Sequence, residues 1–254
     1  MDARVRELVK ATIPVLREHG VALTTYFYQR MFRHNPELNH LFNRSHSETG
    51  KQPTALALSV LAYAENIDDP SVLAPVINLI ANKHASVGIR AEHYPIVGKH
   101  LLASIREVLG DAASDELIHA WGVAYGALAD VFIEAESKLY NEACNSDGGW
   151  SGWRSFRIID KVRESAEITS FHLVPCDGGP LPSYRAGQYT TVRAFVPELG
   201  VMQLRQYTLS IAPGAMHFRI SVKREPASTT TPAGRVSNRL HDFYKVGDML
   251  ELAP

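Results

Sequence analysis

Hydrophobic residues in the first part of the chain recur every three or four positions, which is the spacing of one face of an α-helix. From residue 2 to about residue 143 this pattern predicts six or more helices, and nothing between them resembles a hairpin. In chain order, we expect helices from Val5 to a stop at Gly20, from Phe27 to the residues before Pro36, from about Pro53 to about Ile67, from about Pro75 through His84, from Tyr94 to Val108, and from Leu117, behind a Ser114 cap, to about Tyr140. The pattern therefore predicts an all-α domain over residues 1–143.

The pattern changes at NEACNSDGGWSGW, residues 141–153, where the helical period is lost and Gly, Ser and Asn accumulate. We place a linker at residues 144–153 and a second domain at residues 154–254. Short alternating or β-branched runs separated by Gly and Pro turns follow it: SFRIIDKV, EITSFHLV, QYTTVRAFV, QYTLSIA, HFRISVKR and DMLELA. These runs predict an antiparallel β-barrel or sandwich, with EPASTTTPAG as a surface loop.

Composition narrows the range of partners. A chain of 254 residues with a net charge of −1 and no clustered Lys or Arg has no electrostatic footprint for nucleic acid. We also expect no membrane-spanning segment, because no apolar run looks long enough. The N-terminus lacks the apolar stretch of a secretory signal, and Cys144 and Cys176 form no metal-ligand cluster, so we expect a cytoplasmic protein with free thiols and a small ligand.

His84 falls on the apolar face of its predicted helix, where it is either a hydrogen-bonded core residue or a metal ligand. Glu136 falls on the apolar stripe of the last predicted helix, and a carboxylate there needs a partner unless it lies at the edge of the stripe. His84 could be that partner. Tyr28 and Gln52 could each present a polar tip inside an apolar wall, or they could be a core tyrosine and a solvated glutamine.

Together these positions resemble the globin half of the flavohaemoglobins. The resemblance is carried by Tyr28, Phe42, Gln52, Leu56, Lys83, His84, Tyr94 and AYGxLAxVFIxxExxxY from Ala124 to Tyr140. It implies that His84 ligates the iron of haem b, with Tyr94 and Glu136 hydrogen-bonded behind it. It also implies that Tyr28, Gln52 and Leu56 line the oxygen pocket and that Lys83 lies near the route between haem and flavin. Phe42 would contact the haem or serve as plain core.

The second half is similar to the flavin-binding barrels of the ferredoxin-reductase-like type, through GQY at 187–189 and RQYTLS at 205–210. On an extended strand Arg205 and Tyr207 point to the same face, so a guanidinium can neutralise a phosphate while a phenol packs against the isoalloxazine ring. Thr208 replaces the usual Ser but keeps its hydroxyl. GRVSN, residues 234–238, resembles the segment whose helix N-terminus receives the pyrophosphate. The FAD-contacting residues implied by the resemblance are Tyr189, Arg205, Gln206, Tyr207, Thr208, Gly234, Val236 and Ser237.

The resemblance implies a nitric oxide dioxygenase that converts NO and O2 to nitrate for NO detoxification, with Tyr28, Gln52, Tyr94 and Glu136 as catalytic residues and electrons reaching haem through FAD. Members of that family continue into a nicotinamide-binding domain, whereas this sequence ends at Pro254. We therefore expect either a piece of a longer chain or a protein served by a separate reductase, and an NAD(P)H site only in such a domain or partner. The alternative function is a haem protein that binds O2 or NO without turnover, as a carrier, sensor or sink.

Overall fold

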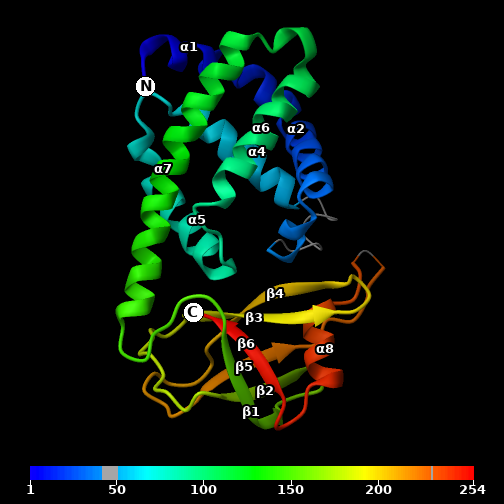
Figure 1. Cartoon of the computed structure of the whole chain (residues 1–254). Coiled ribbons are helices and arrows are strands. Elements are labelled where there is room, and N and C mark those ends of the chain that lie inside the picture. The colour runs from blue at the N-terminus through cyan, green and yellow to red at the C-terminus, as the bar shows by residue number, and fades with distance from the viewer. Residues whose placement is uncertain (42–50, 230) are drawn as a thin grey trace. The chain divides into compact units, whose positions relative to one another are not determined.

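The computed structural model of the chain describes residues 1–41, 51–229 and 231–254 and forms two compact units (Figure 1). The first comprises Met1–Ala85 and Ile89–Lys138, and the second comprises Ser86–Gly88 and Leu139–Pro254. Each unit has its own hydrophobic core. The domain limits expected at residues 143 and 154 stay a prediction.

The first unit is helical, as the hydrophobic pattern predicted. Its described elements are α1 (Ala3–Ala11), α2 (Ile13–His34), η1 (Pro36–His40), α4 (Lys51–Glu65), η2 (Pro70–Leu73), α5 (Ala74–Val87), α6 (His93–Leu109), η3 (Gly110–Ala112) and α7 (Asp115–Asn145), whose last residues belong to the second unit. The α2 helix packs against both α4 and α6 (Figure 1). The expected cap of the last helix is present, because Ser114 Oγ accepts a hydrogen bond from the Leu117 N–H at 3.2 Å.

The first two helices differ from the prediction, because Gly20 ends no helix and lies inside α2. A Cβ atom at position 20 would lie 3.4 Å from Ala57 Cβ of α4, which is ordinary contact, so Gly20 lies where the two helices meet. The break falls earlier, at Thr12, whose hydroxyl donates to Val9 O at 2.6 Å. Pro14 then occupies the first turn of α2, where its missing N–H needs no partner.

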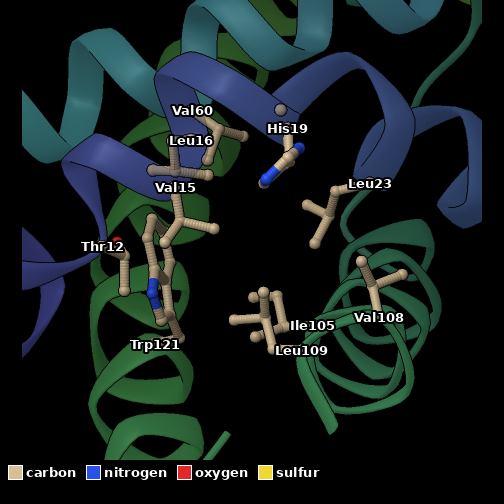
Figure 2. Close-up of a pocket in the computed structure, with 11 residues that line it drawn as sticks. Thr12, Val15, Leu16, His19, Leu23, Val60, Ile105, Val108, Leu109 and Trp121 are labelled. Atoms are coloured by element: carbon tan, nitrogen blue, oxygen red, sulfur yellow. The ribbon is translucent and has the colours of Figure 1, made fainter. Parts of the chain in front are cut away.

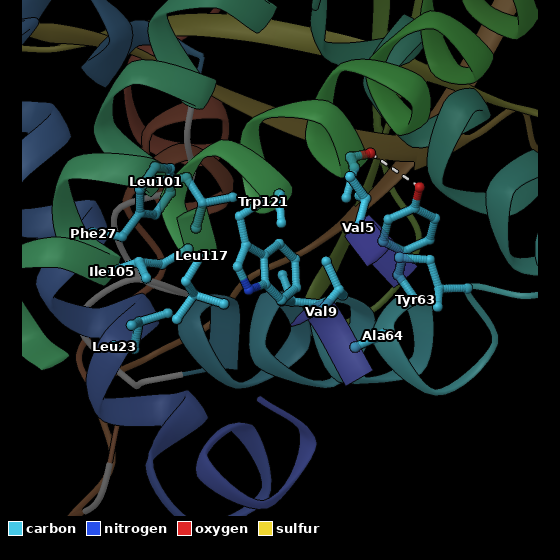
Figure 3. Packing of buried hydrophobic residues seen from close by; sticks show 14 of the residues in the cluster. Val5, Val9, Leu23, Phe27, Tyr63, Ala64, Leu101, Ile105, Leu117 and Trp121 are labelled. Carbon is cyan, nitrogen blue, oxygen red and sulfur yellow. Dashed lines mark hydrogen bonds between the residues drawn. The ribbon is translucent and has the colours of Figure 1, made fainter. Parts of the chain in front are cut away.

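The core of the helical unit joins five helices (Figure 3). Trp121 of α7, 3% exposed, lies among apolar side chains of α1, α2 and α6, and the Tyr63 hydroxyl of α4 donates to Ala124 O at 3.0 Å. Burying each large apolar side chain contributes roughly 1.5–3 kcal/mol relative to leaving it exposed. The labelled residues of Figure 3 are Val5, Val9, Leu23, Phe27, Tyr63, Ala64, Leu101, Ile105, Leu117 and Trp121.

Contrary to the expectation from the sequence, α7 is long and apolar enough to cross a membrane. Of its most apolar 18-residue stretch, 28% is buried inside the protein. A single helix of this kind is weak evidence for a membrane span, because a core helix passes the same test. The side of α7 that carries Leu117, Ala120, Trp121 and Ala124 is buried in the core.

The second unit is an antiparallel sheet that curls on itself, as predicted for a barrel. Its strands are β1 (Arg154–Arg163), β2 (Ile168–Pro175), β3 (Tyr189–Val196), β4 (Val201–Thr208), β5 (Phe218–Lys223) and β6 (Met249–Ala253), in the order β4-β3-β6-β1-β2-β5. A bridge between Leu209, just after β4, and Ile220 of β5 connects the two edges of the sheet. The helix α8 (Arg235–Phe243) adds Val236 and Leu240 to the barrel core (Figure 1).

One strand begins earlier than predicted. The run starting at Gln206 is the end of β4, which already begins at Val201. A tight turn brings the chain back directly from β3, because Gly200, at φ +65°, donates its N–H to Val196 O at 3.0 Å. Hydrogen bonding across this hairpin therefore extends the strand over residues whose alternation is weak.

A buried polar network fixes the end of α2 against α6. His100 is 1% exposed, and its Nδ1 accepts a hydrogen bond from Arg30 Nη1 at 2.6 Å. The ring proton therefore lies on Nε2, which donates to Asn35 Oδ1 at 2.8 Å. Arg30 also pairs with Glu107 at 3.0 Å. A neutral imidazole is thus the form that this network accommodates.

This network predicts that the free energy of unfolding decreases as the pH is lowered. Burial, helped by the charges of Arg30, His34 and Lys99 and opposed by Glu107, lowers the pKa of His100 below its ordinary 6.5. The unfolded chain therefore binds the proton more readily, so the stabilisation is complete above about pH 6.5 and declines as the pH falls below it. In urea unfolding, we expect the free energy of unfolding to drop between about pH 7.5 and about pH 5.5.

The variant His100→Gln, which can still accept from Arg30 and donate to Asn35, should lose part of this dependence. His119→Gln, at an exposed position of α7, is the matched control and should keep it. An equal pH dependence in wild type and His100→Gln would contradict the assignment.

Candidate functional site

Three helices bring the predicted haem ligand and its partners together. His84 lies in the last turn of α5, Tyr94 in the first turn of α6 and Glu136 in α7. The Nδ1 atom of His84 lies 2.7 Å from Glu136 Oε1, and the Tyr94 hydroxyl donates to the same oxygen at 2.5 Å. The structure therefore joins these residues in one hydrogen-bonded group.

The buried Glu136 carboxylate determines which nitrogen of His84 carries the proton. Glu136 is 2% exposed, and a buried carboxylate needs hydrogen-bond donors around it. The His84 Nδ1–H and the Tyr94 O–H supply them, which leaves the Nε2 lone pair of His84 outside the group. Among the described residues Nε2 has no hydrogen-bond partner, and the His84 side chain is 33% exposed. The imidazole is therefore held at one nitrogen and open at the other.

Sequence reasoning missed the residues that support this group. The Tyr125 hydroxyl donates to Tyr94 O at 2.7 Å, and a Cβ atom at Gly98 would lie 2.5 Å from the Tyr125 ring, so only glycine admits that ring. The Phe132 ring lies 5.6 Å from the His84 ring, centroid to centroid. Tyr125 and Phe132 share the apolar stripe of α7, but periodicity alone could not distinguish them from ordinary core residues.

A second group lies on α2 and α4. Tyr28 is buried, forms a side-chain hydrogen bond with Gln52, and stacks on Phe32 with ring centroids 5.8 Å apart. Burial raises the pKa of the Tyr28 phenol, so it carries its proton near neutral pH. The Oε1 atom of Gln52 is buried without a hydrogen-bond partner among the described residues.

The other predicted haem-side residues have simpler surroundings. Leu56 is partly buried against the helical core, and Lys83 is exposed on α5. Phe42 lies outside the described residues.

The donor set fits a haem. Haem iron in globins is held by one imidazole nitrogen, and the other ring nitrogen of such a ligand bonds a carboxylate, a carbonyl or water. His84 meets both requirements. A buried amide oxygen without a partner, as in Gln52, is the kind of group that a bound polar ligand would satisfy.

The candidate flavin site begins on β4. Arg205 and Tyr207 are close enough for the charge of each to act on the other, as expected for the same face of a strand. Burial raises the pKa of Tyr207 and lowers that of Arg205, and Arg235 of α8 lowers the pKa of Arg205 further. In the part of the chain that the structure describes, no carboxylate pairs with Arg205, whose Nη1 donates only to Leu204 O. An anion would compensate this charge.

The neighbouring strand and helix complete the candidate site. Tyr189 of β3 pairs with Thr208 of β4, and Gln206 alternates to the opposite face from Arg205. Gly234 caps α8, and a Cβ atom there would lie 2.4 Å from Ser237 Oγ. Val236 is fully buried in the barrel core, so only its backbone N–H could face an anion.

The helical unit also holds a small apolar cavity of about 20 Å³, and none of the predicted site residues lines it (Figure 2). It lies between α2, α4, α6 and α7, with the His19 ring directed toward it. A space of this size holds about one water molecule. The lining residues are Thr12, Val15, Leu16, His19, Gly20, Leu23, Val60, Ile105, Val108, Leu109 and Trp121.

Known proteins match both units. The globin family model matches residues 25–132. A flavohemoprotein of Chromobacterium violaceum is 60% identical over 253 residues, which is 100% of this chain and 63% of that protein. The chain thus spans about 63% of the length of this relative.

Solved structures agree. A flavohemoglobin of Malassezia yamatoensis, with bound FAD and heme, superimposes with a TM-score of 0.87 at 28% identity, over 99% of this chain and 63% of that one. A globin of Campylobacter jejuni is 36% identical with a TM-score of 0.53, over 55% of this chain and 99% of that one. The resemblance proposed from the sequence is therefore confirmed, and the chain belongs to the flavohaemoprotein family, with a helical globin domain followed by an antiparallel β domain of the ferredoxin-reductase-like FAD-binding type.

Proposed function

We propose that this chain binds haem b and FAD and acts in a nitric oxide dioxygenase, an oxidoreductase that converts NO and O2 to nitrate and so removes NO. The observation that carries the proposal is the buried Glu136 carboxylate 2.7 Å from the Nδ1 atom of His84.

Glu136 and Tyr94 would make His84 a more electron-rich ligand. The buried Glu136 carboxylate accepts the Nδ1–H of His84, which raises the basicity of Nε2 and fixes the orientation of the ring. The Tyr94 hydroxyl holds the carboxylate in place by donating to the same oxygen. Strong donation from an axial ligand favours oxygen activation over reversible storage.

When bound, haem supplies the iron at which O2 and NO combine to nitrate, and FAD supplies the electron that returns this iron to its reduced state. Tyr28 supplies a buried hydroxyl that keeps its proton near neutral pH. A hydrogen bond with Gln52 orients this hydroxyl. Together they form a polar end in an otherwise apolar wall, suited to hold a small polar gas ligand.

The β unit would hold the flavin. Arg205 would neutralise a phosphate of FAD, the phenol of Tyr207 would pack beside the ring system, and the N-terminus of α8, where the N-cap is a glycine, would receive the pyrophosphate. The electron donor to FAD is then NAD(P)H, bound in a further domain or in a partner reductase.

The decisive experiment is the stoichiometry of NO consumption. The purified chain is loaded with haem and FAD, which a visible spectrum quantifies, and is then given O2, NADH and a generic reductase. A dioxygenase consumes many equivalents of NO per haem and accumulates nitrate. Consumption that stops at one equivalent per haem would instead support a carrier, sensor or sink.

His84→Ala should abolish stable haem retention, because the variant lacks the Nε2 atom that would hold the iron. The measurement is the Soret absorbance of the purified variant after haem loading. His119→Ala, an exposed histidine on α7, is the control and should bind haem normally. A normal Soret spectrum of His84→Ala would exclude His84 as the axial ligand.

Tyr28→Phe should accelerate O2 dissociation while leaving haem content unchanged, because it removes one hydrogen bond to the ligand and no apolar contact. One such bond is worth about 1 kcal/mol, or roughly fivefold in rate. Stopped-flow displacement of O2 measures it. Tyr63→Phe, which removes another buried hydroxyl bonded to Ala124 O, is the matched control. An unchanged rate in Tyr28→Phe would assign Tyr28 to packing alone.

Tyr94→Phe should destabilise the chain by about 1.5–3 kcal/mol, because the buried Glu136 carboxylate loses one of its donors. Tyr26→Phe removes a similar bond, to Glu107 at 2.7 Å, at the exposed surface and should cost clearly less. Urea unfolding of both variants without haem tests the difference. Equal costs would show that burial of Glu136 does not depend on Tyr94.

A further inference from the structure

A pair of histidines on the outer face of the barrel belongs to neither candidate cofactor site. His172 lies in β2, and His217 directly precedes β5. The Nδ1 atom of His172 and the Nε2 atom of His217 are 2.8 Å apart, with ring centroids separated by 4.8 Å. The two rings are thus hydrogen-bonded to each other.

The strand register explains this arrangement. His172 pairs with Arg219 across the β2–β5 ladder, so His217 is its diagonal neighbour on the same face, a separation that ring side chains can bridge. Leu173 and Phe218, the alternating neighbours of the two histidines, are buried in the barrel core. The histidine rings therefore stand on the outer face, partly exposed, where an ion from solution reaches them.

The hydrogen bond between the two rings requires that at least one ring is neutral and accepts. A metal ion entering between the rings would take both lone pairs, and the proton now shared would move to the outer nitrogen of its own ring.

The ligand type selects the metal. The hydrogen bond of 2.8 Å places two imidazole nitrogens within reach of one ion once the proton between them leaves. Among the divalent first-row metals that imidazole binds, Cu²⁺ forms the most stable complexes. We propose that His172 and His217 form a binding site for Cu²⁺.

The surroundings leave room for such an ion. On this face Arg219 donates its Nε proton to Ser210 Oγ at 3.2 Å, and the exposed Asp160 carboxylate lies opposite His172 on β1. These charges largely offset each other. The residues that the structure describes contain no group of three or more His, Cys, Asp or Glu side chains placed to hold a metal, so water fills the remaining positions.

The test is a titration of the haem-loaded full chain with Cu²⁺, in which haem occupies His84. Because thiols also bind copper, all proteins carry Cys144→Ser and Cys176→Ser, which replace two exposed cysteines. Competition with glycine gives the affinity, and electron paramagnetic resonance reports the nitrogen ligands. We expect one tight equivalent with two imidazole nitrogens, and weaker binding of Zn²⁺.

His172→Ala and His217→Ala should each weaken Cu²⁺ binding by roughly tenfold or more, because a chelating pair becomes a single ligand. His119→Ala, at an exposed position, should leave the affinity unchanged. Circular dichroism checks the fold of each variant. If His172→Ala misfolds, the Cu²⁺ affinity of His217→Gln, whose position lies outside the strand, tests the site instead. Equal affinity in the pair variants and the control, or a spectrum without imidazole nitrogen, would overturn the proposal.

Discussion

The structure of the candidate haem site depends on one buried carboxylate. Glu136 is 2% exposed, so its charge is tolerable only where donors surround it. This requirement fixes the orientation of His84 from α5 and Tyr94 from α6, and Tyr125 and Gly98 in turn fix Tyr94. Three helices are thereby held in one arrangement by polar contacts that apolar packing alone would not specify.

The β unit uses the opposite charge in the same way. Arg205 is partly buried next to Tyr207 and Arg235, and no carboxylate in the described part of the chain neutralises it. A guanidinium placed like this destabilises the fold unless an anion binds, so the same feature that costs stability prepares a phosphate site. In the β unit a charged group that is poorly compensated within the protein thus indicates the chemistry of its expected ligand.

The sequence predicted elements well where periodicity is strong and poorly where contacts override it. The α6 and α7 helices follow their apolar stripes closely. Gly20 was expected to end a helix, but it lies inside α2, where this helix meets Ala57 of α4. The start of β4 was missed because a hairpin with β3, rather than alternation, defines it.

The sequence by itself determined the two kinds of unit and the residue types of the site, because hydrophobic period and motif spacing are local properties of the chain. It could not decide whether His84 was core or ligand, nor whether Glu136 was paired or exposed. Those residues lie 52 positions apart, and only packing of α5 against α7 brings their atoms within 2.7 Å. The tertiary structure alone decided which nitrogen of His84 is held and which is open, because that depends on where a distant buried charge comes to lie.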